Sequence, residues 1–465
     1  MNRFKRVFLG DRAFYRQVIA IVIPVIIQNS VTNFVNLLDN IMVGQLGTAQ
    51  VSGVAIAGQL VFIFNLLIFG SLSGPGIFGA QFYGAKNLEG FRDTFRLRIW
   101  FCGSILVLFV ISTLVFHDPL IGLFLQGEGD PAAAGEMLAY GREYILWMLP
   151  GMLPFALCMS YASALREAGE TMLPMKASVV AVLTNLVFNY LLIFGHLGFP
   201  SMGVKGAAIA TVVSRFLELA IILYAVHGKK LYPFMYGVYS RMTVPGKLIK
   251  AVLRRGAPLM VNEGLWALGV TAINQIYSMR ALHVLAAISI ASTISNLFNV
   301  LFLSMGNAVA VMVGQALGAN DMPRARANAW RLMFLSVSLC VIIGGTMAVL
   351  APFFPRLYNT EDSVRSLAAG MILIYSALMP FFSINHSSYF VLRSGGSTVV
   401  TFLFDAAFNW VVIVPFSLFL VQATALPIIT VFALSQSIQV FKSGIGLMLV
   451  RHGMWQNNIV GGPQR

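Results

Sequence analysis

The chain has 465 residues, of which 58 % are hydrophobic and only 10 % are charged, and its formal net charge is +14. A soluble domain carries about a quarter charged residues, so this composition excludes a water-soluble globule. The basic residues are scattered through short loops without an aromatic-rich patch, which excludes nucleic acid as a partner. The lipid bilayer is the surrounding that the composition predicts.

Hydrophobic runs of roughly 20 residues recur along the chain, and each is long enough to cross a hydrocarbon core as a helix. Helices are required there because lipid offers the backbone no hydrogen-bond partners. The sequence therefore predicts an all-α polytopic membrane protein with about twelve transmembrane helices. The predicted spans are 15–41, 51–74, 97–116, 138–159, 174–195, 204–226, 256–278, 285–310, 329–350, 366–388, 398–420 and 425–448.

The first predicted span carries polar side chains at steps of three and four residues, which places most of them on one helical face. Asp39 is the only carboxylate among them. An acid within a span is costly to insert, which makes Asp39 a candidate to exchange a proton or, with amide and hydroxyl oxygens, to bind Na⁺. The alternative is a structural acid near the outer headgroups. The polar residues are Gln28, Asn29, Thr32, Asn33, Asn36, Asp39 and Asn40, and we expect Gln28, Thr32 and Asn36 to line a substrate cavity.

Polar residues continue on the fourth, fifth and sixth predicted spans. Asn185 and Asn189 are four residues apart and share a helical face. Tyr144 on the fourth span and Thr211 on the sixth are single polar positions. All are candidates for a functional site, and each is also interpretable as a residue that joins helices in the bundle.

Four further residues are assigned to the wall of the substrate cavity. Met148 and Met152, on the fourth span, offer an adaptable surface for varied substrates, and helix packing is the alternative. Asn296 and Asn299, on the eighth span, belong to a second polar stripe that would line the cavity from the other half.

The second half contains its own ionisable residues within predicted spans. Glu263 lies eight residues after Arg255, and Asp405 lies twelve after Arg393, so both acids are expected toward the cytoplasmic end. Either acid is a second-tier functional candidate, and either can instead pair with an arginine that extends toward the interface. His386 is a weaker candidate.

The two halves of the chain repeat each other in two alignments. The first register pairs Pro24 with Pro258 and runs without a gap through the first two spans of each half; the second register pairs Leu165-Arg166 with Leu392-Arg393, after the fourth and tenth spans. Six spans per repeat give both halves the same orientation, so we expect two six-helix lobes related by a pseudo-twofold axis along the membrane normal. Further identities in the first register are Asn40/Asn274, Asn65/Asn299, Gln81/Gln315, Gly84/Gly318 and Arg92/Arg326.

This repeat predicts an N-lobe at 1–226, a cytoplasmic linker loop at 227–255 and a C-lobe at 256–465. Two lobes around a central cavity would support alternating access, in which a small-molecule substrate binds between the lobes. A duplicated channel or membrane enzyme is the alternative that the repeat alone leaves open.

The distribution of the 31 lysines and arginines predicts the orientation. Most of them fall in loops on the side of the two termini, and cytoplasmic loops are enriched in basic residues. We therefore expect a bacterial plasma (inner) membrane protein with both termini in the cytoplasm and a first helix that is retained, not cleaved as a signal peptide. The basic residues assigned to the outer loops are Lys205, Arg280, Arg356 and Arg365.

Motifs of enzymes are missing from the sequence. There is no Walker A pattern and no His-Glu-x-x-His pattern, which argues against direct use of ATP and against intramembrane hydrolysis. The cysteines Cys102, Cys158 and Cys340 lie inside hydrophobic runs without metal-ligand spacing, so we expect buried spectators. No cofactor and no metal are expected, apart from H⁺ or Na⁺ as a coupling ion.

Four motifs resemble those of the multidrug and toxic compound extrusion (MATE) transporters, and the resemblance covers nearly the whole chain. It implies two six-helix lobes in a V shape and export of drugs or metabolites, often amphipathic cations, by H⁺ or Na⁺ antiport. It also implies a protein that is no enzyme, and we expect a monomer. The motifs are Asn36-Leu37-Leu38-Asp39, 79–87 (GAQFYGAKN), 165–171 (LREAGET) and 203–211 (GVKGAAIAT).

Resemblance to the DinF-like branch of this family further implies a cation site in the N-lobe. The family's aspartate on the first helix, with polar groups on helices 4, 5 and 6, matches Asp39, Tyr144, Asn185, Asn189 and Thr211. Some relatives have a second acid where this chain has Asn189, so the site here carries one negative charge less.

The second half departs further from the family. An acid on the seventh helix of other branches corresponds to Trp266, and Glu263 lies one turn earlier; no aspartate is apparent on the tenth helix. Two alternatives to drug export remain. A lipid-linked saccharide flippase of the same superfamily would need a strongly basic cavity, and a membrane-embedded enzyme would need a catalytic cluster.

Overall fold

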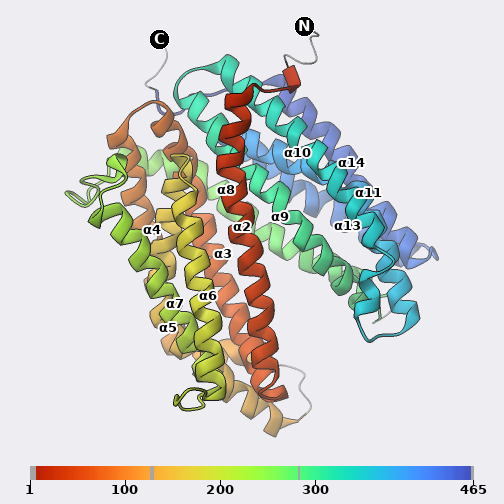
Figure 1. Ribbon diagram of the computed structural model, residues 1–465. Helices are drawn as coiled ribbons and strands as arrows, with labels where there is room; N and C mark the ends of the chain where they lie inside the picture. Colours follow the sequence, from red (N-terminus) through yellow and green to blue (C-terminus); the bar gives the residue numbers. More distant parts are fainter. Residues whose placement is uncertain (1–6, 126–129, 281–282, 462–465) are drawn as a thin grey trace. The chain divides into compact units, whose positions relative to one another are not determined.

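The computed structural model describes residues 7–125, 130–280 and 283–461, and every regular element in these ranges is a helix (Figure 1). The predicted all-α class is confirmed. The first half contains α2 (Arg12–Gly44), α3 (Thr48–Gly84), α4 (Leu88–Gly122), α5 (Pro131–Glu167), α6 (Met172–Phe194) and α7 (Gly203–Leu223), which continues into the π-helical η1 (Tyr224–Gly228).

The second half contains twin elements for each of these. They are α8 (Gly246–Ser278), α9 (His283–Gly318), α10 (Met322–Leu350), α11 (Asp362–Ser394), a run of α12 (Thr398–Phe402), η4 (Leu403–Ala407), η5 (Asn409–Ile413) and α13 (Val414–Ala423), and finally α14 (Ile428–His452). Short 3₁₀ turns, η2 (Pro233–Met235) and η3 (Phe354–Leu357), lie between helices.

All the predicted spans coincide with helices, and most of these helices extend beyond the predicted limits. In the described ranges, 11 helices are long and apolar enough to cross a membrane. The predicted span 256–278 is helical, as α8, but is too polar to meet that criterion, since it carries Asn262 and Glu263 and begins among lysines and arginines. Its polarity is explained below by the groups that these two side chains contact.

The internal repeat is visible in the backbone. Lys86 and Asn320, which the first register pairs, both adopt a positive φ, at 58° and 59°. Residues other than glycine rarely adopt this left-handed conformation. Gly169 and Gly396, which the second register pairs, share it as well, with φ of 88° and 73°. Both registers found in the sequence therefore correspond to repeated turns.

The C-terminal ends of α3 and α9 cross in a reciprocal way. A Cβ on Gly84 would overlap the backbone of Gln315, and a Cβ on Gly318 would overlap the backbone of Gln81. Each glycine thus approaches the glutamine of the other repeat, which is the contact pattern of a twofold relation. Glycine is required at both positions because only a residue without a side chain permits the two backbones to approach so closely.

The chain divides into two compact units that do not coincide with its two halves. One unit contains Met1–Ile26, Ile77–Asn87 and Lys250–Arg465, and the other contains Ile27–Gly76 and Leu88–Ile249. The ends of α2 and α3 thus belong with the second-half helices, and the crossing of α3 and α9 lies inside the first of these units. The predicted lobes at 1–226 and 256–465 stay a prediction.

The predicted linker at 227–255 is only partly a loop. Its last residues are helical, because α8 begins at Gly246. The part before α8 packs on α4, where Arg96 Nε donates a hydrogen bond of 2.8 Å to the carbonyl of Val238. This segment belongs to the same compact unit as α4.

Candidate functional site

The carboxylate of Asp39 meets the amide side chains of α6. Asn189 Nδ2 donates a hydrogen bond of 2.6 Å to Asp39 Oδ1. Asn189 is 2 % exposed and Asn185 is 6 % exposed, whereas Asp39 is half-buried. No basic side chain lies within ion-pair distance of Asp39 in the described part of the chain; Arg215 on α7, which is paired with Glu218, acts on it only from farther away. The acid is thus held by neutral dipoles.

Asn185 and Thr211 extend this group of polar residues. The Asn185 amide has one orientation in which both its nitrogen and its oxygen are hydrogen-bonded. In this orientation Asn185 Nδ2 lies 2.8 Å from Asp39 Oδ2, and Asn185 Oδ1 accepts from Thr211 Oγ1 at 3.2 Å. In the other orientation of the Asn185 amide, the single Thr211 hydroxyl hydrogen is donated instead to the carbonyl of Ala207, one turn earlier in α7, at 3.1 Å, and Thr211 Oγ1 accepts from Asn185 Nδ2. Helices α6 and α7 pack against each other (Figure 1), which holds the amides and the hydroxyl in place.

Two further observations bear on a cation at Asp39. Asn189 Oδ1 is buried, and no described residue donates a hydrogen bond to it. Tyr144 on α5 is close enough to interact with the charge of Asp39, but no hydrogen bond joins the two among the described residues. Carboxylate, amide and hydroxyl oxygens are ligands that suit a hard cation. The donor set therefore fits Na⁺ as well as a proton.

Three predicted cavity residues on α2 differ in their surroundings. Asn36 is exposed and Thr32 is half-buried. Gln28 is half-buried and lines a cavity inside the compact unit that contains Asp39. Of the three, only Gln28 is placed by the structure at a described cavity.

The two methionines assigned to the cavity wall lie among apolar side chains. Met148 and Met152 are 7 % and 2 % exposed. They belong to a hydrophobic cluster with Phe64 and Ile68, inside the compact unit that contains Asp39. Thioethers fill gaps in such cores readily. This burial favours helix packing, the alternative interpretation, and their assignment to a substrate cavity stays a prediction.

Asn296 and Asn299 lie on α9 in the other compact unit, where Asn296 is exposed and Asn299 is half-buried. Their assignment to the cavity wall stays a prediction. The cysteines Cys102, Cys158 and Cys340 are free and buried, as expected.

The acids of the second half have basic partners, although not the nearest ones in sequence. Tyr389 Oη donates to Glu263 Oε1 at 2.9 Å, and Arg393 Nη1 lies 3.8 Å from the same oxygen. Asp405 does not use Arg393: its Oδ1 accepts from Lys442 Nζ at 2.7 Å. Both acids are thus neutralised by the chain itself.

Asp405 lies in the π-helical turn η4, and Asn262 on α8 braces it. Asn262 Nδ2 donates to Asp405 Oδ2 at 3.0 Å, and its Oδ1 accepts from the backbone N–H of Ala406 at 3.1 Å. These contacts explain why α8 is polar. His386 stacks beside Tyr389 and Phe390, and among the described residues its Nε2 has no hydrogen-bond partner.

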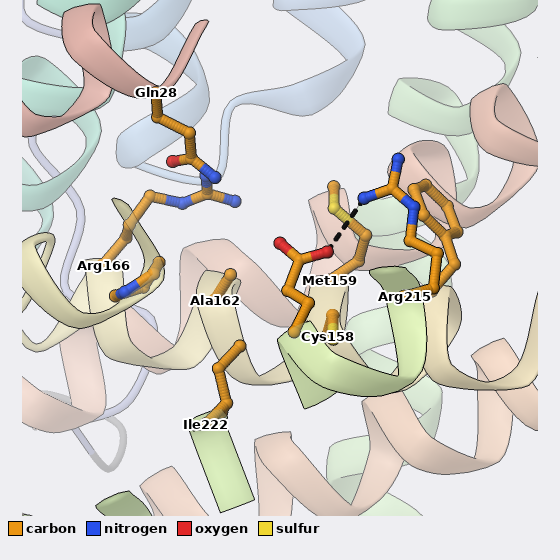
Figure 2. A pocket seen from close by; sticks show the side chains of 10 residues that line it. Gln28, Cys158, Met159, Ala162, Arg166, Arg215 and Ile222 are labelled. Carbon is orange, nitrogen blue, oxygen red and sulfur yellow. Dashed lines mark hydrogen bonds and ion pairs between the residues drawn. The ribbon is translucent and has the colours of Figure 1, made fainter. Parts of the chain in front are cut away.

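A small cavity opens beside α5 within the unit that contains Asp39 (Figure 2). In Figure 2 Gln28 and Arg166 lie on one side of the cavity and Arg215 on the other. Arg215 Nη1 forms an ion pair of 2.8 Å with Glu218 Oε2 across one turn of α7. The lining residues are Gln28, Phe155, Cys158, Met159, Ala162, Arg166, Pro174, Arg215, Glu218 and Ile222.

Sequence reasoning overlooked this cavity and its ion pair. Arg215 and Glu218 are three residues apart on one predicted helix, a spacing that signals an i, i+3 pair. The involvement of Arg166 had no such local signal, since the cavity also needs residues of α2, α6 and α7. In the described ranges no group of three or more His, Cys, Asp or Glu side chains is arranged to hold a metal.

The fold and the polar group around Asp39 define a class of protein, a duplicated helical membrane protein with a carboxylate set among amides. The MatE family model matches residues 24–191 and again residues 258–419. The two matches begin at Pro24 and Pro258, the pair that defines the first register of the repeat. The chain belongs to the MATE family of transporters.

Relatives and solved structures agree with this membership. The chain is 22 % identical over 450 residues to "Probable multidrug resistance protein NorM" of Thermotoga maritima, covering 96 % of this chain and 94 % of the relative. It is 24 % identical over 425 residues to "Probable multidrug resistance protein YoeA" of Bacillus subtilis, covering 90 % and 89 %.

Among solved structures, an outward-facing MATE family multidrug resistance transporter superposes with a TM-score of 0.83 at 18 % identity, covering 97 % of this chain and 99 % of the other. A mutant of the Vibrio cholerae MATE transporter VcmN gives 0.83 at 20 % identity, covering 96 % and 98 %. These similarities establish a shared fold.

Proposed function

We propose that this MATE-family chain exports small amphipathic molecules, drugs and organic cations among them, by antiport with H⁺ or Na⁺, and that Asp39 is the coupling acid. The observation that carries the proposal is the contrast between acids. Glu167, Glu218, Glu263 and Asp405 each face an arginine or lysine side chain, whereas Asp39 faces amides. An acid without a fixed counter-charge is free to take up and release a cation.

The Asn185 amide supplies a device for two states of Asp39. With Nδ2 toward Asp39 Oδ2, the amide stabilises the ionised carboxylate. With the amide turned over, Nδ2 donates to Thr211 Oγ1 at 3.2 Å, and Oδ1 faces the acid. In that second orientation Asn185 Oδ1 accepts from Asn189 Nδ2 at 3.3 Å and faces the Asp39 carboxylate, a second acceptor, so a proton on Asp39 would favour it. Protonation therefore reorganises the contact between α2 and α6, which links occupancy of the site to helix packing.

Sodium would act through the same residues. The buried Asn189 Oδ1, which no described residue pairs, the Asp39 carboxylate and the Thr211 hydroxyl would supply oxygen ligands. Binding would turn these oxygens toward one cation and withdraw them from the amide donors.

The printed names of the relatives in Thermotoga maritima and Bacillus subtilis support multidrug substrates. The distribution of basic loops supports a plasma-membrane protein with cytoplasmic termini. A lipid-linked saccharide flippase is not favoured by the described cavity, because Glu218 neutralises Arg215 and leaves a single arginine, too little positive charge for a diphosphate.

Transport in proteoliposomes tests the proposal. A fluorescent organic cation is loaded, and its efflux is driven by an imposed H⁺ gradient or an imposed Na⁺ gradient. Wild type is expected to respond to one of the two gradients, which identifies the ion, and Asp39→Asn is expected to lose that response. Gradient-driven efflux that persists at the wild-type rate in Asp39→Asn would refute the role of Asp39.

A further inference from the structure

The cavity of Figure 2 is lined by a guanidinium, that of Arg166, which has no ion-pair partner among the described residues; the charge of Glu167 acts on it only from beyond ion-pair distance. Among the described residues, Arg166 has no hydrogen-bond acceptor, no ion-pair partner and no aromatic ring against it. The neighbouring acid, Glu167, forms its ion pair with Arg98 and accepts from Ser163 Oγ at 2.9 Å. The cation of Arg215 is already paired with Glu218. The cavity therefore carries one positive charge in excess.

The second half of the chain contains a counterpart of Arg166 whose charge is neutralised by neighbouring side chains. In the second register, Arg166 corresponds to Arg393 and Ala162 corresponds to Tyr389. Arg393 is 3.8 Å from the carboxylate of Glu263, and Tyr389 donates to that carboxylate at 2.9 Å. In the second half an acid and a phenol thus occupy the space around the arginine.

The first half lacks both of these groups. In the first register, Glu263 corresponds to Asn29, the residue after Gln28, so an amide replaces the acid. Ala162 replaces the phenol of Tyr389 and lines the cavity instead of filling it. The cavity and its excess charge therefore arise from the same two differences between the repeats.

Arg166 is half-buried, and a half-buried guanidinium without a fixed counter-charge favours an anion that enters the cavity. The walls fit a small organic anion. Gln28 offers an amide donor on the side of Arg166, and Phe155 and Met159 offer apolar surface on the side of Arg215. A guanidinium pairs with a carboxylate through two parallel hydrogen bonds, which makes a carboxylate the best match for Arg166.

We propose that the cavity around Arg166 binds one monovalent anionic group, preferentially a carboxylate, at the position that Glu263 fills in the second half. Two sources share this chemistry: the carboxylate of a zwitterionic transported molecule, and a free anion from solution. The first source rests on the proposed export function and extends it from amphipathic cations to zwitterions. Cation release at Asp39 and anion recognition at Arg166 would then use separate groups of one compact unit.

The transport test uses a carboxylated rhodamine and its ethyl ester, which differ only in the anionic group. Arg166→Gln is expected to raise the KM for the carboxylated dye about tenfold to a hundredfold, because a charge-assisted hydrogen bond is lost. The KM for the ester is expected to stay unchanged. Arg166→Lys keeps the charge without the planar fork, so an intermediate KM is expected. Arg254→Gln, which removes an exposed arginine of α8, is the matched control.

A second variant copies the other repeat and guards against a simple loss of folding. Asn29→Glu combined with Ala162→Tyr supplies the carboxylate and the phenol that neutralise Arg393 in the second half. It retains Arg166 and is expected to raise the KM for the carboxylated dye as much as Arg166→Gln does. Normal transport of the ester by this variant shows that it is folded.

Bromide binding provides a readout that does not depend on transport. Crystals soaked in sodium bromide are expected to show an anomalous peak at Arg166 in wild type and none in Arg166→Gln.

A bromide peak together with equal KM values for both dyes in every variant identifies a free anion as the source. If neither dye is exported by wild type, the export proposal fails while the bromide peak still decides the anion site. No peak in wild type and no effect of Arg166→Gln on the carboxylated dye overturn the inference.

Discussion

At the scale of single residues, the N-terminal site depends on which acids the chain leaves without a counter-charge. Asp39 is held by Asn185 and Asn189, and neither amide can neutralise it. Asp405, by contrast, is tied to Lys442 at 2.7 Å. Neutral partners permit a change of charge on Asp39, whereas the ion pair of Asp405 favours one fixed state.

Removing one amide should weaken coupling without removing the acid. Asn189→Ala deletes the donor of the 2.6 Å hydrogen bond to Asp39. Loss of one hydrogen bond to a charged group costs about 1–3 kcal/mol, so we expect the initial rate of gradient-driven efflux to fall roughly tenfold. Thr184→Ala is the control on the same helix, since Thr184 bonds only to the carbonyl of Val180. Equal rates for Asn189→Ala and wild type would contradict this role.

The ion pair of the second half is expected to be structural. Lys442→Met leaves Asp405 buried without a cation, which should cost roughly 3–5 kcal/mol and lower the thermal unfolding midpoint of the purified protein. The double variant Lys442→Met/Asp405→Asn removes both charges and should regain most of that loss. A double variant that unfolds at the same temperature as the single one would show that the pair is not coupled.

At the scale of elements, the repeat determines how α3 and α9 meet. Their ends cross with backbone against backbone, because glycine stands at 84 and 318. The same repeat produces left-handed turns at Lys86 and Asn320 directly after the two helices. A short sequence motif therefore specifies both the crossing and the turn that follows it.

This crossing makes a prediction about stability. Gly84→Ala would place its Cβ into the backbone of Gln315, so the two helices would have to separate. We expect a lower unfolding midpoint, with a loss of about 2 kcal/mol or more. Gly103→Ala on α4 is the control, because a Cβ there meets nothing within 4 Å and alanine favours the helix. An unfolding midpoint of Gly84→Ala at or above that of wild type would be incompatible with the close approach.

At the scale of the whole molecule, the basic loops predict which ends of the helices face the cytoplasm. A single cysteine at His196, in the exposed turn after α6, should react with a membrane-impermeant maleimide added to intact cells. A cysteine at Lys229, after η1, should react only once the cells are opened. The native Cys102, Cys158 and Cys340 are buried and give little background. The reverse labelling pattern would invert the proposed orientation.

Much of the architecture follows from the order of residues alone. Apolar runs long enough to span a bilayer must be helices, and the match of Pro24 with Pro258 and Gln81 with Gln315 identifies the duplication. The polar stripe of α2 singled out Asp39, because it is the only carboxylate of the predicted span and a carboxylate within a membrane is costly to insert. These conclusions depend on local periodicity, which does not require knowledge of packing.

Other features were decided by the tertiary structure, because they depend on which helices become neighbours. Met148 and Met152 are core residues, since α5 turns them toward Phe64 and Ile68. Asp405 pairs with Lys442, although Arg393 is nearer in sequence.

The unpaired Arg166 is a feature of the same kind. It emerges only when α2, α5 and α7 are brought together around one cavity. Sequence alone determined the helices, their duplication and the acid that we propose for coupling. Packing alone decided which charges are neutralised, because a counter-charge acts through distance in space and not through separation along the chain.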